Sequence, residues 1–258
     1  MNNQDKFNEL RKKYPDFIYE KYEILFDSEN LNIKYYFNIP GLTYFYPEIK
    51  INKKYIKTNY DEEYLNYLVF QIGLIELISY VKCTCSPNIN IKCGYVNDKQ
   101  IKFLNKLYFN GLGEFLYTNH ISVNSDELFN VFCTHDVMSL GKIQYNGVGN
   151  LICVGGGKDS CVSLELLKNE ENNSCFIINP KGPSYDSCVV AGYGDDEIIG
   201  VKRILDRKIV ELNQKGYLNG HTPFSSIVAF ITYLVAYLNG KKNIILSNEA
   251  SANQPTVI

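Results

Sequence analysis

The sequence has no tryptophan and almost no net charge. Its 26 lysines and arginines stand against 28 aspartates and glutamates, a formal net charge of −2. Proteins that bind nucleic acid or anionic membranes through charge need clustered Lys and Arg, and the composition shows no such excess. We therefore expect neither nucleic acid nor a membrane among the partners, and expect a small-molecule substrate instead.

Long apolar segments are also missing. The first residues are polar and lack the apolar stretch of a secretory signal. The longest apolar run, Ile227–Leu238, is roughly 12 residues, well short of the ~20 that a bilayer span needs. Together with 45% hydrophobic and 21% charged residues, these absences are typical of a soluble globular protein and predict a cytoplasmic chain.

Eight cysteines are present, but their spacing does not favour a metal site. Cys83, Cys85 and Cys93 lie closest together, and no CxxC pair or suitably spaced histidine completes a zinc-binding set. Scattered cysteines in a reducing cytosol are mostly small buried hydrophobes. The sequence therefore favours buried thiols over a structural metal or disulfides.

The most informative segment is a glycine-rich turn. An apolar strand at 150–154 leads into Gly155-Gly156-Gly157, and Lys158-Asp159-Ser160 then open a helix that runs to about Lys168. Consecutive glycines let the backbone approach an anion closely. The helix start directs free N–H groups and a positive dipole end at the turn. With the charge of Lys158 and the hydroxyl of Ser160, the segment predicts a phosphate-binding loop.

Two common nucleotide motifs do not fit this loop, because neither the G-x-x-x-x-G-K-[ST] spacing nor a G-x-G-x-x-G pattern is found around it. The loop resembles the PP-loop of the ATP pyrophosphatases, usually Ser-Gly-Gly-x-Asp-Ser, with Gly155 in place of the first serine. That resemblance implies cleavage of ATP between the α and β phosphates. The alternative is an ordinary strand-to-helix turn, although such turns rarely carry Lys-Asp-Ser at the helix start.

The predicted elements divide the chain into two parts. Residues 1–145 form a smaller α+β region, with a polar helix from 1 to about 20, β-rich segments over 22–56, and helices over 61–82 and 98–109. In residues 146–258 strands and helices alternate, with strands at 150–154, 174–179 and 243–246 and helices at 160–168, about 198–213 and 224–238. Alternation of this kind predicts an α/β fold whose parallel sheet has helices on both faces. The PP-loop resemblance implies the HUP-type form of that fold.

Two further polar segments fall at element ends. One, Gly216–Pro223, precedes an apolar helix and contains Asn219-Gly220-His221. The other, Leu246–Asn253, follows a strand and contains Ser247-Asn248-Glu249. Ligands bind at the carboxyl ends of parallel strands, so these side chains are suited to hold a nucleotide or a polar substrate. Taken alone, His221 also fits a plain turn residue and the second segment a plain polar loop.

In this order, the three segments resemble the UDP-N-acetylmuramoyl-L-alanyl-L-glutamate epimerase family. The stretches Gly73–Tyr80 and Gly111–Phe115 are also similar to that family's N-terminal part, so the likeness spans about residues 70 to 258. It implies an isomerase that uses ATP and Mg²⁺ to invert the terminal L-glutamate in peptidoglycan precursor synthesis. Family members are expected to continue well beyond the Ser-Asn-Glu motif, so we expect residues 146–258 to be a nucleotide-binding domain that is incomplete at its C-terminus.

The resemblance also implies roles for single residues. An acyl-adenylate would make the glutamate α-proton far easier to abstract, because it removes the negative charge of the carboxylate. Asp159 would orient the loop or bind Mg²⁺, and Lys158 would stabilise phosphate charge during catalysis. His221 and Glu249 are alternative candidates for the general acid or base. The expected ATP-binding residues are Gly155, Gly156, Gly157, Lys158, Asp159, Ser160, Ser247 and Asn248, and the expected substrate-binding residues are Asn219, Gly220, Ser251 and Asn253.

Two other readings of the sequence stay open. One is a different PP-loop adenylating enzyme, such as a tRNA-thiolating or amide-forming ligase, although the near-neutral charge argues against a tRNA substrate. The other is a nucleotide-binding module without turnover. Pyrophosphate release separates the enzymes from the module, and dependence on the acceptor substrate separates the two enzymes.

Overall fold

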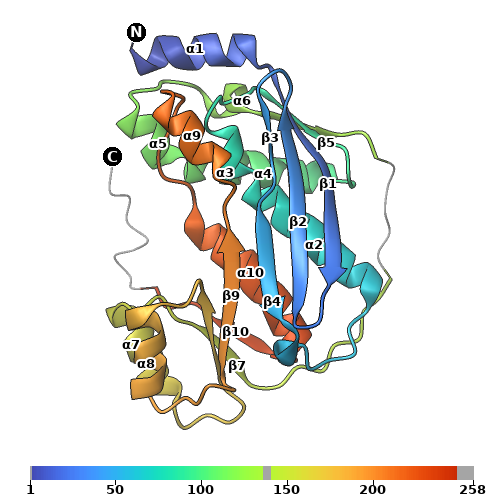
Figure 1. Ribbon diagram of the computed structural model, residues 1–258, viewed down its shortest axis with the longest axis vertical. Coiled ribbons are helices and arrows are strands. Elements are labelled where there is room, and N and C mark those ends of the chain that lie inside the picture. The colour runs from blue at the N-terminus through green and yellow to red at the C-terminus, as the bar shows by residue number, and fades with distance from the viewer. Residues whose placement is uncertain (1, 136–140, 249–258) are drawn as a thin grey trace.

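The computed structural model describes residues 2–135 and 141–248, and in these residues one mixed β-sheet runs through the whole molecule (Figure 1). The strand order is β10-β7-β8-β9-β4-β2-β1-β5-β6, with β3 paired to β2. The strands are β1 (Asp16–Phe26), β2 (Asn30–Ile39), β3 (Thr43–Phe45), β4 (Glu48–Asn52), β5 (Asn88–Ile91), β6 (Asn130–Cys133), β7 (Asn150–Cys153), β8 (Ser174–Ile178), β9 (Ile198–Ile204) and β10 (Asn243–Ile245). The helices are α1 (Asn3–Lys13), α2 (Glu62–Glu76), α3 (Ile78–Val81), α4 (Asp98–Gly111), α5 (Gly113–Thr118), α6 (Ser125–Leu128), α7 (Lys158–Leu167), α8 (Gly182–Val190), α9 (Lys208–Gln214) and α10 (Phe224–Asn239), with a 3-10 turn η1 (Lys53–Tyr55).

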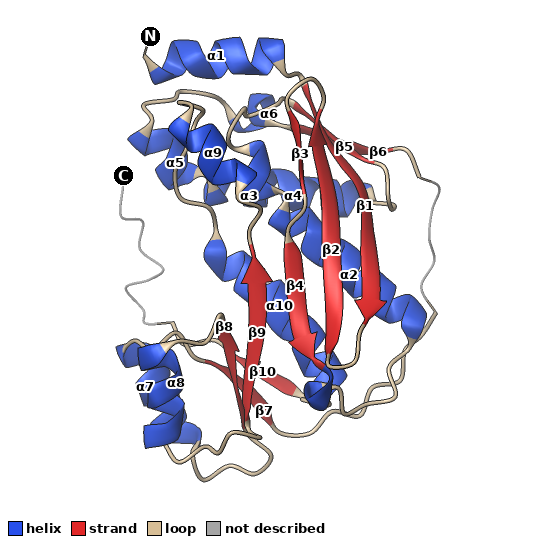
Figure 2. Ribbon diagram, in the orientation of Figure 1, coloured by secondary structure: helices blue, strands red, loops and turns tan. Residues whose placement is uncertain are grey.

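In the first half of the chain, the sheet has one covered face. Strand β2 pairs antiparallel with β1 and β4, and its side chains alternate between buried and half-buried, as strand geometry requires. Its apolar side chains pack with the apolar face of α2 in the main core. Figure 2 shows α2 and α10 together behind β1, β2 and β4, while no helix of the described residues lies in front of these strands.

The contact between α2 and the sheet depends on a close approach at Gly73. A Cβ built there would lie 2.0 Å from the Tyr19 hydroxyl oxygen and 2.4 Å from Tyr19 Cζ. The Tyr19 ring is fully buried and stacks on Phe70, with ring centroids 5.8 Å apart. The glycine therefore makes room for a large side chain beneath the helix.

In the second half, β10, β7, β8 and β9 are all parallel. Alternate residues of β7 face opposite cores: Leu151 and Cys153 belong to the main core together with α10, whereas Ile152 packs in a smaller core with residues of α7 and α8. Helices thus cover both faces of these strands, and the predicted α/β arrangement is confirmed at this level. The antiparallel strands of the first half agree with the predicted α+β character of residues 1–145.

The two halves are joined by an antiparallel ladder between β4 and β9, in which Lys50 is opposite Lys202. Beside this ladder lies a buried ion pair. Arg203 Nε and Nη2 donate to the two oxygens of Glu76 at 2.8 Å each, and Nη2 also donates to Ser79 Oγ at 2.9 Å. The side chains are only 9% and 1% exposed. The division into parts at residue 145 stays a prediction, and the structure adds that one sheet passes through both.

Several predicted elements are confirmed and three differ. The helices at 61–82, 98–109 and 224–238 and the strands at 150–154, 174–179 and 243–246 are present with small shifts of their ends. The predicted helix over 198–213 is wrong, because its first part is strand β9 between β8 and β4, and only Lys208–Gln214 is helical. The first helix ends at Lys13 instead of near 20, since Pro15 precedes β1. Helix α8 lies between the predicted elements at 174–179 and 198–213, where no helix was predicted.

One stretch has the length and hydropathy of a membrane span. Residues Glu62–Val81, which cover α2 and α3, are 20 residues long with mean hydropathy 1.4, but 78% of the stretch is buried inside the protein. Helix α2 packs in the main core against the sheet and α10. Core packing therefore accounts for the apolar character of this stretch.

Candidate functional site

A pocket of about 830 Å³ opens at the carboxyl ends of β7, β8 and β10. The chain leaves β7 towards β8 on one side and returns by α10 to β10 on the other side of β7. This reversal of strand order is the place where open parallel sheets usually bind ligands. The lining comes from four segments: residues 153–160, the end of β8 with the start of α8, the first turn of α10, and residues 246–248.

The glycine turn presents bare backbone to the pocket. Among the residues that the structure describes, no atom lies within 4 Å of a Cβ built on Gly155 or on Gly157. Gly156 differs, because its φ of +84° is left-handed and a Cβ there would lie 2.7 Å from the backbone nitrogen of Ser184 in α8. The middle glycine of the turn thus packs against α8, and the two outer glycines leave the backbone accessible to a ligand.

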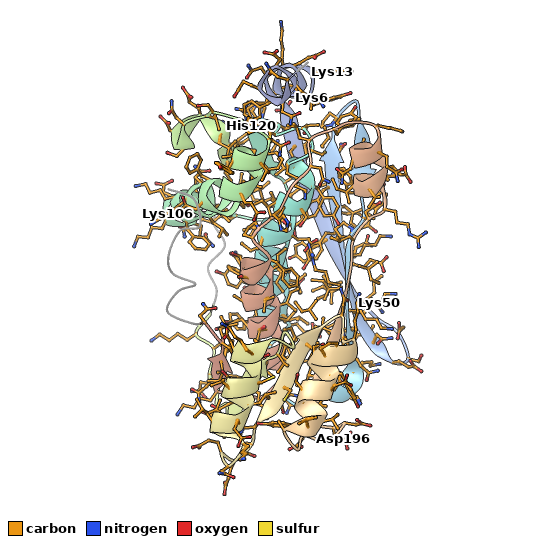
Figure 3. All side chains as sticks on the ribbon, turned by 90° about the vertical axis from the view of Figure 1, so that its left-hand side faces the viewer. Lys6, Lys13, Lys50, Lys106, His120 and Asp196 are labelled. Carbon is orange, nitrogen blue, oxygen red and sulfur yellow. The ribbon has the colours of Figure 1, made fainter. Side chains whose placement is uncertain are left out.

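Three helices begin at this pocket. The first turns of α7, α8 and α10 contribute lining residues, among them Lys158, Ser184 and Ser225. Each helix start carries a partial positive charge and unpaired N–H groups. Lys181, directly before α8, also lines the pocket and adds a second cation near Lys158. The pocket is therefore suited to a polyanion. Figure 3 looks at the side on which α7 and α8 lie next to each other, at the opposite end of the molecule from α1.

The hydroxyl of Ser160 has a partner within the loop. Its Oγ donates to the carbonyl oxygen of Gly157 at 2.8 Å, and the residue is 5% exposed. The contact closes the first turn of α7 directly after the glycines. Ser160 therefore stabilises the shape of the loop, while its neighbours Lys158 and Asp159 are more exposed at the pocket.

The segment after β10 reaches the same loop. Ser247 and Asn248 line the pocket, and Ser247 Oγ donates to Ser163 Oγ of α7 at 2.7 Å. Two of the three predicted segments are therefore brought together. The predicted residues Glu249, Ser251 and Asn253 lie outside the described residues.

The third predicted segment lies beside the pocket and packs on the junction of α4 and α5. Asn219, Gly220 and His221 are not among the described residues that line the pocket. A Cβ on Gly220 would lie 2.9 Å from Cδ2 of Phe115. His221 Nε2 lies 3.7 Å from Oε1 of Glu114, and both side chains are exposed, at 79% and 60%. Phe224, three residues further on, lines the pocket.

With this geometry in hand, comparison with known proteins identifies the family. The family described as the MurL N-terminal domain matches residues 8–258. The chain belongs to this family. It is 31% identical over 182 residues to a UDP-N-acetyl-alpha-D-muramoyl-L-alanyl-L-glutamate epimerase of Xanthomonas oryzae pv. oryzae (strain MAFF 311018), over 70% of this chain and 40% of the relative. It is 30% identical over 191 residues to an epimerase of the same name from Salinispora tropica (strain ATCC BAA-916 / DSM 44818 / JCM 13857 / NBRC 105044 / CNB-440), over 72% of this chain and 40% of the relative.

The match thus spans well under half the length of these curated relatives. No solved structure matches the chain. The family resemblance inferred from the sequence is confirmed. The roles of the single residues stay predictions, because membership in the MurL N-terminal family assigns none of them.

In this member of the family, sequence reasoning missed Asn179, Lys181 and Phe224, which all line the pocket. Asn179 was counted only as the last residue of the strand at 174–179, and Lys181 was missed because α8 was not predicted. Its start is nevertheless marked in the sequence, since Pro183 stands within the first turn and proline favours that position. Phe224 was counted as the first apolar residue of α10 only.

The described residues offer no metal-binding group of three or more His, Cys, Asp or Glu side chains. Five of the cysteines are buried (Cys83, Cys85, Cys153, Cys175 and Cys188). Burial raises the pKa of Cys83 and of Cys93 to about 12, which keeps both thiols protonated and poorly reactive at neutral pH. The cysteines of the described chain therefore act mainly as small core residues.

Proposed function

We propose that the pocket binds ATP and that the protein serves the ATP-dependent epimerisation of the terminal L-glutamate of UDP-N-acetylmuramoyl-L-alanyl-L-glutamate. The observation that carries the proposal is the glycine turn, which opens onto a pocket where α7, α8 and α10 all begin, in a chain of the MurL N-terminal family. The strand order β10-β7-β8-β9 supports a PP-loop-type sheet, because a phosphate loop after β7 then lies at the reversal point.

The residues at the pocket fit a triphosphate with its metal. Gly155 and Gly157 leave the backbone N–H groups open to phosphate oxygens, and Lys158 and Lys181 supply positive charge. Asp159 is the carboxylate nearest the predicted phosphate site along the chain. A single carboxylate is enough there, since Mg²⁺ keeps most of its waters and is usually held by one or two carboxylates together with phosphate oxygens. Apolar residues such as Phe176 and Val228 line the remaining walls.

The proposed chemistry begins with transfer of the adenylyl group. A carboxylate oxygen of the terminal glutamate forms a bond to the α-phosphorus, the bond to the bridging oxygen breaks, and pyrophosphate leaves. Lys158 and the loop N–H groups stabilise the charge on the phosphate oxygens. The neutral acyl group then lets a base remove the α-proton, a proton returns on the opposite face, and water releases AMP and the D-glutamyl product. His221 and Glu249 are our candidates for this proton transfer.

Pyrophosphate release tests the proposal. The protein is given ATP and Mg²⁺ with and without the UDP-muramoyl dipeptide, and ATP binding is measured in parallel by calorimetry. We expect release that requires the dipeptide, and a chiral assay that detects D-glutamate after hydrolysis. Lys158→Ala should weaken ATP binding and lower release at least tenfold, since one charge-assisted hydrogen bond is worth about 1.5–3 kcal/mol.

Lys168→Ala is the matched control, because Lys168 is an exposed lysine just after α7 that pairs with Glu165. This variant should behave as the unmodified protein. ATP binding without dipeptide-dependent release would favour a nucleotide-binding module. Release that depends on a different acceptor would favour another adenylating enzyme. Failure to bind ATP in a folded protein would refute the proposal as a whole.

A further inference from the structure

We infer that Glu114 and His221 form the acid–base pair that moves the substrate α-proton, with Glu114 as the positioning residue that orients and charge-stabilises His221. The inference rests on the proposed function and deepens it. It starts from the 3.7 Å separation of His221 Nε2 and Glu114 Oε1. The sequence pattern predicts a proton-transfer role for His221 or Glu249 and none for Glu114.

Folding alone gives little reason for this contact. Both side chains are mostly exposed, and an exposed ion pair contributes little to stability because water screens it. At 3.7 Å the carboxylate and the imidazole are at ion-pair distance and too far apart for a direct hydrogen bond. A carboxylate at this distance stabilises the charged form of a histidine, and it orients the ring for proton transfer when the contact tightens in the substrate complex. The pair is therefore better explained by chemistry than by stability.

The two segments that carry the pair are held tightly together. A Cβ built on Gly111 would lie 2.5 Å from Cγ of Pro223, and one on Gly220 would lie 2.9 Å from Cδ2 of Phe115. Each glycine leaves room for a residue of the other segment. The two close approaches flank the contact between Glu114 and His221 along both segments. Asn119 Nδ2 also donates to the carbonyl oxygen of Asn219 at 2.9 Å. The backbone that presents Glu114 and His221 is thus fixed from both sides, as an acid–base pair requires.

The pair also lies within reach of the nucleotide pocket. Phe224 and Ser225, in the first turn of α10, line the pocket. Three peptide units separate His221 from Phe224, so their Cα atoms are at most about 11 Å apart. The carbon that loses its proton is bonded to the carboxyl carbon that carries the adenylyl group. A base that stands just before the start of α10 is therefore close enough in the chain to serve this carbon.

The step balances without another reactant. The α-carbon–hydrogen bond breaks, an imidazole nitrogen of His221 takes the proton, and the electron pair is delocalised into the activated carbonyl as an enolate. The Glu114 carboxylate stabilises the imidazolium. A proton that has equilibrated with water then returns to the opposite face of the carbon. In heavy water the product therefore carries deuterium at this carbon.

The test compares two rates in heavy water for each variant: deuterium incorporation at the glutamate α-carbon, by mass spectrometry, and pyrophosphate release. For His221→Gln we expect incorporation to fall at least 100-fold, the range of general base catalysis, and for Glu114→Gln at least tenfold. In both variants incorporation should fall much further than release. Glu114→Asp, which keeps the charge, should recover part of the loss. Glu23→Gln removes a half-buried glutamate that forms an ion pair with Lys21 in the first half of the sheet, and it should change neither rate.

Each result decides between the proposals. Lys158→Ala should lower both rates together, because exchange requires activation first, and this contrast separates the two steps. Equal losses of incorporation and release in Glu114→Gln would mean a structural role and would overturn the inference. Full incorporation in His221→Gln would overturn it as well. A wild-type protein that binds ATP but releases no pyrophosphate would refute the proposed epimerisation itself. The proposed role of Glu114 and His221 in that reaction would then be refuted too.

Discussion

Replacing the three glycines of the turn by alanine, one at a time, should show which of them stabilises the fold and which is needed for ligand binding. Gly156 has a left-handed φ of +84°, which costs a residue with a Cβ about 1–2 kcal/mol. The new Cβ would also lie 2.7 Å from the Ser184 nitrogen and 2.9 Å from the Pro183 carbonyl carbon. These are backbone atoms that cannot turn away, and overpacking of this kind costs about 1–3 kcal/mol.

Gly156→Ala should therefore lower the free energy of unfolding by about 2–5 kcal/mol. At roughly 2–4 °C per kcal/mol for a chain of this size, its melting temperature should fall by roughly 4–20 °C. A Cβ at Gly155 or Gly157 would meet no atom of the described chain within 4 Å, and neither residue has a left-handed φ. Gly155→Ala and Gly157→Ala should therefore unfold as the unmodified protein does. Urea titration at 25 °C, with the slope checked for constancy, measures all three.

For the two outer glycines we expect weaker ATP binding, although the stability of the fold should not change. If phosphate oxygens contact the bare backbone, a methyl group at Gly155 or Gly157 blocks at least one charge-assisted hydrogen bond of about 1.5–3 kcal/mol, which weakens binding about tenfold or more. Calorimetry on the folded variants measures this loss. Two results would refute the reasoning: ATP affinity unchanged in both outer variants, or a Gly156→Ala protein as stable as the original.

Three further predictions concern the fold. Gly73→Ala should lower the free energy of unfolding by about 1–3 kcal/mol, because the new Cβ would clash with the buried Tyr19 beneath α2. This cost should exceed the gain from alanine as the better helix former. A urea midpoint at or above that of the original protein would contradict the prediction. Arg203→Met should cost about 3–5 kcal/mol by leaving the Glu76 carboxylate buried and unpaired, and adding Glu76→Leu should restore most of the loss in the same assay. The pKa of Asp27 is lowered to about 2, chiefly by a hydrogen bond from Asn32. Because this lies below its ordinary value of 3.8, the stabilisation is present at neutral pH and is lost as the pH falls from about 4 to 2. Asp27→Asn should flatten the urea midpoint over that window, and an unchanged pH profile would speak against the interaction.

The parts of the fold that depend on local patterns were predictable from the sequence. The apolar spacing in 61–82 fixes α2, and the strand–glycine–helix order fixes the loop after β7. Strand β9 was not predictable in this way, because Ile198, Ile199 and Val201 fit either a helix or a strand. Pairing with β4, far away in the sequence, decides the outcome.

In the candidate site, too, local motifs were predictable and contacts between distant residues were not. The predicted phosphate loop is a local motif, so the place of this glycine turn at a strand end could be foreseen. The approach of Glu114 to His221 and the packing of Gly156 on α8 join residues that are far apart in the chain. Contacts of this kind depend on the topology of the sheet and leave no pattern in a single sequence.

The ladder between β4 and β9 limits how the protein can enclose a ligand. Many two-part enzymes close by rotating one part about a connecting segment. Here the backbone hydrogen bonds of one continuous sheet connect the strands beside the pocket to those of the first half, and the buried contact of Arg203 with Glu76 reinforces the connection. The halves cannot swing apart without breaking these bonds. Any closure over a ligand in the pocket must therefore come from the loops at the strand ends, while the sheet keeps its shape.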